Sequence, residues 1–345
     1  MNSGGDAGAA WLLADVGGTN VRFALAQPAA APPLRPETLR AFRVAEFATL
    51  ADAAAAYLEA LGGAMPRPTR AVLAVAGRVE DGQAHLTNHP WHIQARQLEQ
   101  NLALREVRLV NDFAALGMSL PLLTAQDFEC IGPAAVPIRR EAGCRVFCVL
   151  GPGTGLGVSA LAVEGDTVLG LETEGGHVGF APGNEEEIAI LRQLLARFDR
   201  VSLERLLCGS GLSNLHLALC AIAGRPRQPL APEAITAAAQ DRSDPYCVRA
   251  VELFCELLGS AAGDCVLAHG AWHGVYLAGG LAAPLLPWLR DGRFRSRFEA
   301  KGRFAAAMAH VPVALITHPQ PGLLGASAFA LAAAGRPLLR AMESA

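Results

Sequence analysis

The sequence predicts an α/β protein made of two similar units in tandem, each beginning with a β-hairpin. Two glycine-rich turns indicate this, because each lies between two apolar runs typical of strands rather than between a strand and a helix. Short apolar runs of strand-like composition follow each hairpin, and helical patterns separate them. The turns are Asp15-Val16-Gly17-Gly18-Thr19-Asn20 and Gly151-Pro152-Gly153-Thr154-Gly155-Leu156-Gly157.

The first unit combines short buried strands with a well-marked helix. The helix is expected over residues 49–61, because Thr49 and Asp52 form a capping-box pattern at its start and Gly62 follows its end. The proline-rich residues 28–36 are expected to form a loop. The strands are expected over residues 11–16, 21–25, 71–76 and 107–110.

The second unit repeats this pattern and adds longer helices. A helix is expected to begin after Asn184, which forms a capping pattern with Glu187. Residues 246–267 predict a long, largely buried helix, and residues 223–232 a loop. A last helix over 323–334 is rich in Ala and Gly, which suits close packing. Strands are expected over residues 146–150, 158–163 and 274–278.

The composition is that of a soluble globular enzyme. The chain has 345 residues, of which 52% are hydrophobic, and a net charge of −3, which suits two domains with cores of their own. It holds 28 arginines and a single lysine, Lys301, a ratio we attribute to a GC-rich genome. Because no basic cluster or basic stripe with interleaved aromatic residues occurs, nucleic acid is not expected as a partner.

A cytoplasmic protein is expected. The first ten residues carry no basic segment of the kind that opens a signal peptide. The uncharged residues 274–289 are shorter than a membrane span and contain Pro284 and Pro287, so no membrane association is expected. The eight cysteines include no Cys-x-x-Cys pair, which favours reduced, packed thiols over disulfides.

The two turns suggest a nucleoside triphosphate as substrate. A Gly/Thr turn exposes several backbone N–H groups that can hold an anion, and two such turns can hold a chain of phosphates from two sides. A P-loop is excluded, because Lys301 has no glycine six residues before it. A dinucleotide-binding turn is disfavoured, because a strand rather than a helix follows Gly155.

Asn111-Asp112 places a carboxylate at the end of a buried strand, where the chain turns into a helix expected to begin near Ala114. Strand ends in α/β folds face the ligand crevice. Asp112 can therefore be the general base of a phosphoryl transfer, since such a base must lie within hydrogen-bond reach of the attacking hydroxyl. The alternative, that Asp112 only caps the helix, remains open.

Glu174-Gly175-Gly176-His177 is a second polar group. Two glycines permit a tight turn that brings the carboxylate and the imidazole together, as needed to bind vicinal sugar hydroxyls. A zinc site there would lack a third nearby ligand. From spacing alone, Glu204 is an ordinary surface acid of a helix. Three more histidines, His85, His89 and His92, are expected on a surface loop rather than on a metal-binding helix face.

Taken together, these segments resemble the bacterial glucokinases that lack a zinc-binding cysteine cluster, within the hexokinase and actin-like ATPase superfamily. The resemblance runs collinearly over almost the whole chain. It rests on residues 13–20, Leu86-Thr87-Asn88-His89-Pro90-Trp91, residues 110–113, 151–157 and 174–177, Leu277-Ala278-Gly279-Gly280 and Pro321-Gly322-Leu323-Leu324-Gly325.

The resemblance implies the two-domain actin-like ATPase (ribonuclease H-like) fold. Each domain would be a mixed β-sheet flanked by helices, with the active site in the interdomain cleft. The small domain would comprise residues 1–120 and 321–345, and the large domain residues 121–320. The family also implies a homodimer. Cys208, in the turn after Glu204, departs from the family pattern and raises the question of redox sensitivity.

The resemblance also implies a reaction, the phosphorylation of glucose at its 6-hydroxyl by ATP, and a role for each matched residue. Asp112 would be the base, and Asp15 would position Mg²⁺, through water. Gly279 and Gly280 would let the adenosine approach the backbone. The phosphates would be held by Ala14, Asp15, Val16, Gly17, Gly18 and Thr19 and by Gly153, Thr154 and Gly155. The other sugar hydroxyls would be bound by Asn111, Glu174, His177 and Glu204.

Three alternatives to a glucose kinase remain. A kinase of a related hexose or amino sugar would share every motif, because selectivity depends on contacts near the sugar's C2 that the sequence does not locate. A catalytically silent sugar-binding sensor could keep the same fold. A filament-forming ATPase would not need the polar residues assigned to the sugar.

Overall fold

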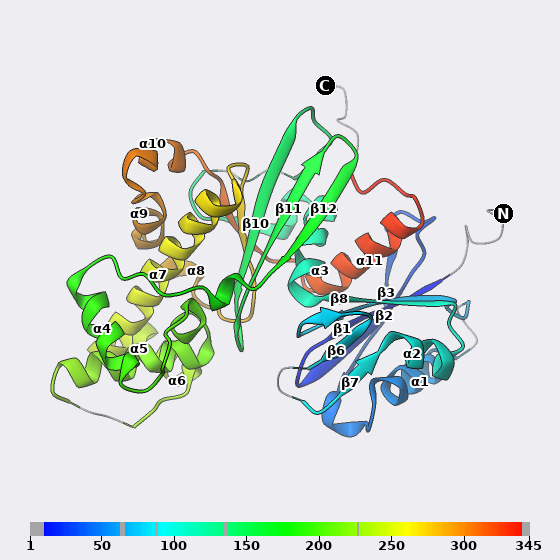
Figure 1. Ribbon diagram of the computed structural model, residues 1–345, viewed down its shortest axis with the longest axis horizontal. Coiled ribbons are helices and arrows are strands. Elements are labelled where there is room, and N and C mark those ends of the chain that lie inside the picture. The colour runs from blue at the N-terminus through cyan, green and yellow to red at the C-terminus, as the bar shows by residue number, and fades with distance from the viewer. Residues whose placement is uncertain are drawn as a thin grey trace.

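The computed structural model describes residues 10–62, 66–86, 89–133, 135, 137–225 and 228–339. Its main elements are two β-sheets with a pair of helices, α3 and α11, between them (Figure 1). Further helices cover the outer face of each sheet. The first nine residues, Thr87 and Asn88 lie outside the described residues, so the structure does not address those parts of the sequence analysis.

The first sheet has five strands in the order β3-β2-β1-β4-β8. β1 and β2 form the expected hairpin around the first glycine-rich turn, and β1, β4 and β8 run parallel. The strands are β1 (Trp11–Val16), β2 (Asn20–Ala26), β3 (Leu34–Arg43), β4 (Arg70–Val75) and β8 (Glu106–Asn111). Since β3 begins at Leu34, the prediction of a loop through residue 36 was wrong at its end.

The second sheet repeats this topology and adds a short antiparallel edge strand, in the order β12-β11-β10-β13-β14-β9. β10 pairs antiparallel with β11 and parallel with β13, as β1 does with β2 and β4. The prediction of two hairpin-led units is therefore confirmed. The strands are β9 (Phe128–Cys130), β10 (Cys144–Pro152), β11 (Leu156–Glu164), β12 (Thr167–Thr173), β13 (Val275–Leu277) and β14 (Val313–Ile316).

Both faces of the leading strands are buried, which explains their continuous apolar runs. In β1, Leu12 packs with the outer helices while Leu13 faces the helices between the sheets. In β10, Cys148 faces the outer helix α7 and Val149 faces inward. Side chains that alternate along a strand thus join two cores, as the two-residue period requires.

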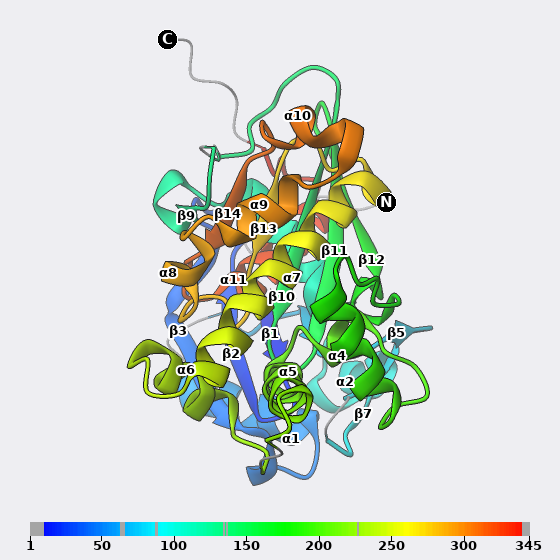
Figure 2. The same ribbon diagram turned by 90° about the vertical axis from the view of Figure 1, so that its left-hand side faces the viewer.

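The helices that the sequence predicts are present, and others occur beside them. α1 keeps its capping box, in which Thr49 and Asp52 bond reciprocally, and α4 is capped by Asn184. The helices are α1 (Leu50–Leu61), α2 (Ala95–Leu102), α3 (Asp112–Ser119), α4 (Glu185–Leu195), α5 (Gly209–Ile222), α6 (Pro232–Gln240), α7 (Pro245–His269), α8 (Leu286–Leu289), α9 (Arg293–Glu299), α10 (Ala305–Met308) and α11 (Pro321–Ala333). Figure 2 shows α7 crossing the second sheet.

The central helices cross between the two units. α3 follows the first sheet but packs on β11 and β12 of the second, whereas α11 follows the second sheet but packs on β1 and β4 of the first. The two helices also pack tightly on each other, because a Cβ at Gly325 would overlap the carbonyl oxygen of Ala115. Small residues in α11 therefore permit the close packing that the sequence predicts.

A small third sheet carries two of the three histidines in question. It consists of β5 (Val79–Glu80), β6 (Gln83–His85) and β7 (His92–Gln94). His85 and His92 are paired across β6 and β7, and their rings stack with centroids 4.2 Å apart. The surface position is confirmed for both, but the loop assignment was wrong, since both lie on strands.

Among the described residues, no helix has the length and apolar character needed to cross a membrane.

Candidate active site

The first glycine-rich turn brings Asp15 next to the start of the last helix. The turn is tight, because the N–H of Gly17 donates to the carbonyl oxygen of Asn20 at 3.0 Å. A Cβ at Gly322, in the first turn of α11, would lie only 2.9 Å from Cγ of Asp15. Burial raises the pKa of Asp15, and Arg22, whose Nη1 lies 3.4 Å from Oδ2, opposes that shift.

The residue that caps α3 is Asn111, not Asp112. Oδ1 of Asn111 accepts hydrogen bonds from the N–H groups of Phe113 (2.9 Å) and Ala114 (3.1 Å), and its Nδ2 donates to the carbonyl oxygen of Gly77 at 3.1 Å. α3 therefore begins two residues earlier than expected, at Asp112. This excludes the reading in which Asp112 serves only as the helix cap, and leaves its carboxylate in the first helical turn.

The electrostatic setting of Asp112 raises its pKa to about 7. Burial is the main cause, and the negative charges of Asp15 and then Glu174 add to it, against the lowering effect of hydrogen bonding from the Phe113 N–H. Asp15 and Glu174 therefore lie close enough to Asp112 for their charges to act on it. A carboxylate with a pKa near 7 is suited to accept a proton at neutral pH.

Phe113 joins the helix that carries Asp112 to the hairpin that carries the second glycine-rich turn. Its ring lies on Gly151 and Gly157, which face each other across β10 and β11, and a Cβ at Gly157 would overlap the ring. Ser159 adds a polar contact, because its hydroxyl donates to the carbonyl oxygen of Phe113 at 2.8 Å. The two glycines thus make room for an aromatic side chain.

The second turn itself is shorter than the sequence indicates. β10 and β11 extend to Pro152 and Leu156, and the N–H of Gly153 donates to the carbonyl oxygen of Gly155 at 2.8 Å. The turn rests on the start of α5, where the N–H of Gly209 donates to the carbonyl oxygen of Gly153 at 2.9 Å. Because a Cβ at Gly153 would have no heavy atom within 4 Å, this backbone faces open space.

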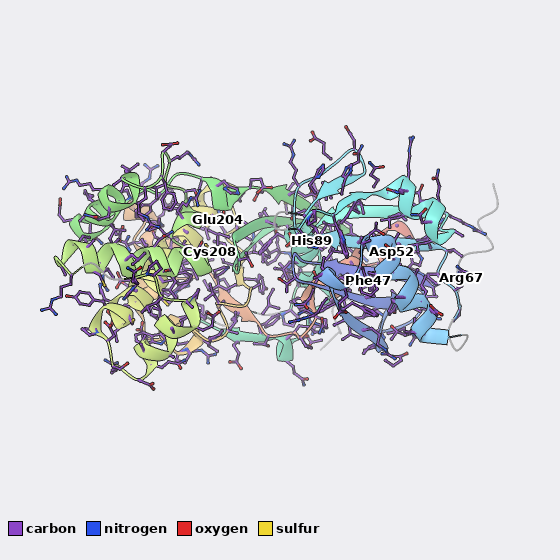
Figure 3. The ribbon with its side chains drawn as sticks, turned by 90° about the horizontal axis from the view of Figure 1, so that it is seen from below. Phe47, Asp52, Arg67, His89, Glu204 and Cys208 are labelled. Carbon is purple, nitrogen blue, oxygen red and sulfur yellow. The ribbon has the colours of Figure 1, made fainter. Side chains whose placement is uncertain are left out.

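Glu204 reaches this turn from the 3₁₀ helix η6 (Leu203–Arg205). Its Oε2 accepts a hydrogen bond from the N–H of Leu156 at 2.9 Å, and its Oε1 lies 4.0 Å from Nδ1 of His177. Glu204 is therefore not an ordinary acid on a helix surface. Figure 3 places Glu204 in the half of the molecule built on the second sheet and His89 in the other half.

The glycines before His177 serve close packing on β11. The segment Gly175–His177 is the 3₁₀ helix η5, and neither of its glycines has a positive φ. A Cβ at Gly176 would overlap the carbonyl oxygen of Leu156, and one at Gly175 would lie 2.9 Å from Val158. The pair therefore brings Glu174 and His177 near the second turn by allowing backbone contact.

Gly279 and Gly280 lie beside the same hairpin. Gly279 has a φ of +88°, a conformation that favours glycine, and a Cβ there would lie 2.5 Å from the carbonyl oxygen of Pro152. Gly280 has no heavy atom within 4 Å of a built Cβ, so its backbone is open to an approaching group. This places an exposed backbone segment next to the second turn.

The geometry thus combines a carboxylate of nearly neutral pKa, two tight glycine-rich turns and the polar side chains of His177 and Glu204 beside the second turn. Comparison with known proteins shows which family has this combination. The glucokinase family model matches residues 12–333. A glucokinase of Stenotrophomonas maltophilia (strain K279a) is 48% identical over 319 residues, covering 92% of this chain and 94% of that protein. The chain belongs to the glucokinase family.

Further comparisons agree with membership of the glucokinase family. A glucokinase of Xanthomonas campestris pv. campestris (strain B100) is 48% identical over 323 residues, covering 93% of this chain and 94% of that protein. The crystal structure of a glucokinase from an Antarctic psychrotroph is 34% identical, with a TM-score of 0.82 over 93% of this chain and 98% of that one. The fold is that of the actin-like ATPases, as the sequence predicts.

Within this glucokinase-family fold, several residues near the predicted site were not singled out from the sequence. Arg22 pairs with Asp15 across the β1–β2 hairpin, and Ser159 contacts Phe113 only through tertiary packing, and neither was given a role. Phe113 belongs to a recognised motif, but its contact with the second hairpin depends on how α3 crosses to the second sheet. Gly322 belongs to a recognised motif, but its contact with Asp15 depends on how α11 crosses back to the first sheet.

Cys208 has a structural role in this glucokinase-family chain. It is buried and caps α5, since its Sγ accepts a hydrogen bond from the N–H of Gly211 at 3.3 Å. Its Sγ also lies 3.2 Å from Oγ of Ser210. A buried capping thiol is poorly placed to react with an oxidant in solution.

Proposed function

We propose that this chain phosphorylates glucose at the 6-hydroxyl with ATP and that Asp112 is the general base. The observation that carries the assignment of the base is the pKa of Asp112, which burial and two neighbouring carboxylates raise to about 7. A base of that pKa accepts the hydroxyl proton as the oxygen attacks the γ-phosphorus, and ADP leaves. ATP-dependent glucose phosphorylation is the reaction of the family to which the chain belongs.

The nucleotide phosphates lie between the two turns. Backbone N–H groups of residues 14–19 hold them on one side and those of Gly153, Thr154 and Gly155 on the other. The open backbone at Gly153 supports this, because no side chain occupies the space beside it. Gly279 and Gly280 admit the adenosine, and the positive φ of Gly279 keeps this segment against β10.

The remaining sugar hydroxyls are bound by Asn111, Glu174, His177 and Glu204. Asn111 uses one N–H of its amide to hold Gly77, so a second N–H is available for a hydroxyl. His177 and Glu204 offer a paired donor and acceptor, since their side chains lie 4.0 Å apart. Water is excluded as an acceptor when sugar binding brings the two halves of the site together.

Mg²⁺ is a second part of this proposal. Asp15 offers the hard oxygen ligand that Mg²⁺ prefers. We expect the carboxylate to contact the ion through water, because Mg²⁺ keeps most of its hydration shell. The residues fit the ion, because Asp15 adds negative charge next to Asp112, and among the described residues only Arg22 forms an ion pair with Asp15. Bound Mg²⁺ would neutralise phosphate charge.

The proposal extends to domains, assembly and location. Residues 1–120 with 321–345 form the small domain and 121–320 the large one, which the packing of α11 on β1 and β4 supports. The enzyme is a homodimer, as in the family it resembles, and works in the cytoplasm, where ATP is supplied. All eight cysteines are free, which suits a reducing compartment.

The test is the initial rate of phosphorylation with Mg-ATP for glucose, mannose, glucosamine and N-acetylglucosamine. Glucose should give the highest kcat/KM, and Asp112→Asn should lower turnover by about 10²–10⁴ while glucose still binds in a calorimetric titration. A higher kcat/KM with another sugar would make the chain a kinase of that sugar. Sugar binding without turnover would identify a sensor.

A further inference from the structure

Two sulfur atoms and an imidazole meet between β10 and α7, away from the groups assigned to phosphoryl transfer. Ligand atoms of Cys148, Cys265 and His269 all lie within 4.8 Å of one another. We propose that these three residues form a binding site for a thiophilic divalent cation, with Zn²⁺ as the best match. Two thiolates and an imidazole are donors that Zn²⁺ prefers, and three protein ligands leave a fourth position for water.

The fold presents these ligands from two elements. Cys265 and His269 are four residues apart on α7, so they share one face of the helix. Cys148 lies on the face of β10 that packs against α7, because side chains of β10 alternate between two cores. The site therefore follows from the helical and strand periods together, and no local motif such as Cys-x-x-Cys marks it.

The hydrogen bond made by the His269 ring suits a metal ligand. Nδ1 of His269 lies 3.1 Å from the carbonyl oxygen of Cys265, and a carbonyl oxygen only accepts hydrogen bonds. Nδ1 must then carry the proton, which leaves the lone pair of Nε2 for a metal and fixes the ring, as is usual for metal-binding histidines.

Both sulfurs must be thiolates when they bind the cation. Sγ of Cys148 donates a hydrogen bond to the carbonyl oxygen of Ser159 at 3.2 Å, so Cys148 must release this proton when the cation binds.

The cluster is reachable from one side. Cys148 is fully buried and Cys265 nearly so, but His269 is partly exposed at the end of α7. A bound cation would join the end of α7 to β10, three residues before Gly151 of the second turn. A different group, His216, Asp244 and Cys247, is less suited, because it offers one sulfur and Asp244 already accepts hydrogen bonds from the N–H groups of Tyr246 and Cys247.

Cobalt substitution tests the site independently of kinase activity. The full-length protein is reduced, treated with a chelator, transferred to chelator-free buffer and titrated with Co²⁺. One equivalent should produce a thiolate-to-cobalt charge-transfer band and the intense visible bands of tetrahedral Co²⁺, and one equivalent of Zn²⁺ should remove them. Zn²⁺ should also raise the melting temperature of the wild-type protein, because it binds the folded state.

Variants locate the site. Cys265→Ala should weaken Co²⁺ binding at least tenfold and reduce the charge-transfer band, since even outer-shell partners of metals cost about 10–100-fold. His269→Gln, at the exposed edge, should weaken binding without endangering the fold. Cys255→Ala is the matched control, because it removes a buried thiol of the same helix that lies outside the cluster.

Two results would overturn the proposal. A reduced wild-type protein that gives no charge-transfer band on titration has no thiolate site. A band that Cys265→Ala and His269→Gln both leave unchanged belongs to other residues. Formation of a Cys148–Cys265 disulfide in air is controlled by running each titration with reductant and counting free thiols beforehand.

Discussion

Glu204 accepts a hydrogen bond from the backbone N–H of Leu156 at 2.9 Å. This bond connects a residue proposed to bind the sugar directly to the second glycine-rich turn. The contact is close, because a Cβ at the neighbouring Gly155 would overlap Oε2 of Glu204. The same carboxylate lies beside His177. One side chain thus contacts both the proposed sugar-binding residues and the proposed phosphate-binding turn.

Loss of Glu204 should therefore affect both substrates. Glu204→Ala removes the acceptor for the Leu156 N–H, and we expect kcat/KM to fall by about 10–100-fold for glucose, with a raised KM for ATP as well. His177→Ala is the control, since within the described residues no hydrogen bond joins the His177 side chain to the turn, and it should change KM for glucose alone. Steady-state kinetics with each substrate varied would measure this. An unchanged KM for ATP in Glu204→Ala would contradict the link.

The pKa of Asp112 predicts the pH dependence of the reaction. The base acts only when deprotonated, so kcat/KM for glucose should rise with pH up to about 7 and then level off. Below that pH, each unit should cost about tenfold. The profile should be measured at saturating Mg-ATP from pH 5 to 9, which covers about two pH units on either side of the pKa. If the apparent pKa of the profile lies near the ordinary value for an aspartate, Asp112 is not the limiting base.

Asp112 should also lower the stability of the ligand-free protein at high pH. Its folded-state pKa is raised above the unfolded value, so the folded state binds more protons between the two pKa values and loses stability as pH rises through that interval. Asp112→Asn mimics the neutral form and should be more stable than wild type by roughly 1–3 kcal/mol at pH above 7. The difference should vanish below about pH 4, where both chains are neutral at this position. Urea unfolding at both pH values tests the sign.

Two glycines of the second hairpin should differ sharply in their response to alanine. A Cβ at Gly157 would overlap the ring of Phe113, so Gly157→Ala should destabilise the protein by about 1–3 kcal/mol, as overpacking does, and lower kcat by displacing Asp112. Gly153→Ala is the matched control, because its Cβ would meet no heavy atom within 4 Å. It should keep wild-type stability and raise KM for ATP. Thermal melts and ATP kinetics on the pair would separate packing from phosphate binding.

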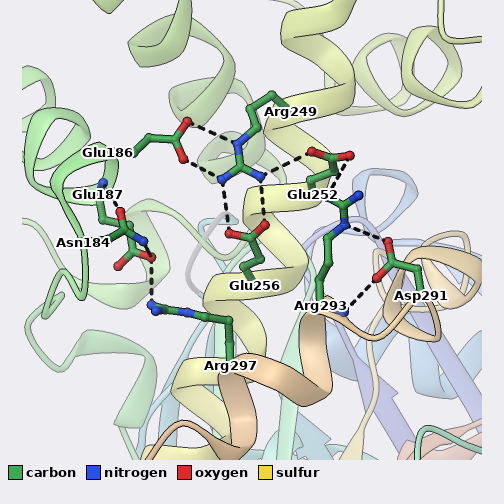
Figure 4. Close-up of polar contacts among 9 residues, drawn as sticks. All are labelled: Asn184, Glu186, Glu187, Arg249, Glu252, Glu256, Asp291, Arg293 and Arg297. Carbon is green, nitrogen blue, oxygen red and sulfur yellow. Dashed lines mark hydrogen bonds and ion pairs between the residues drawn. The ribbon is translucent and has the colours of Figure 1, made fainter.

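A buried ion pair between the helices of the second unit should matter more than its exposed neighbours. Glu187 is fully buried, and its Oε1 accepts a hydrogen bond from Nη2 of Arg297 at 2.8 Å (Figure 4). Arg297→Met should cost about 3–5 kcal/mol, since it leaves a buried carboxylate without its cation. Arg293→Met breaks the ion pairs of Arg293 with Glu252 and Asp291. Because the Arg293 side chain is 42% exposed, this change should cost only about 0–1 kcal/mol. Urea unfolding of both variants should be compared, and similar losses would contradict this ranking.

Local patterns in the sequence were enough to predict most of the fold. Apolar runs around two glycine-rich turns gave the leading hairpins, because both faces of β1 and β10 are buried and leave no polar positions. Capping patterns at Thr49 and Asn184 marked two helix starts correctly, since caps are contacts within a few residues. The edge strand β3 was placed partly in a loop and the edge strand β9 was missed, because partly exposed strands lack a continuous apolar signal.

The sequence by itself determined the family, the two glycine-rich turns proposed to hold phosphate, and the identities of the polar residues proposed for the site. Only the tertiary structure decided which of these groups act on one another. The pKa of Asp112 depends on Asp15 and Glu174, which are distant in sequence, and on burial that no local pattern encodes. The cluster of Cys148, Cys265 and His269 likewise forms only when α7 packs on β10. Electrostatic coupling and ligand geometry depend on distance in space, and the chain sets that distance only by folding.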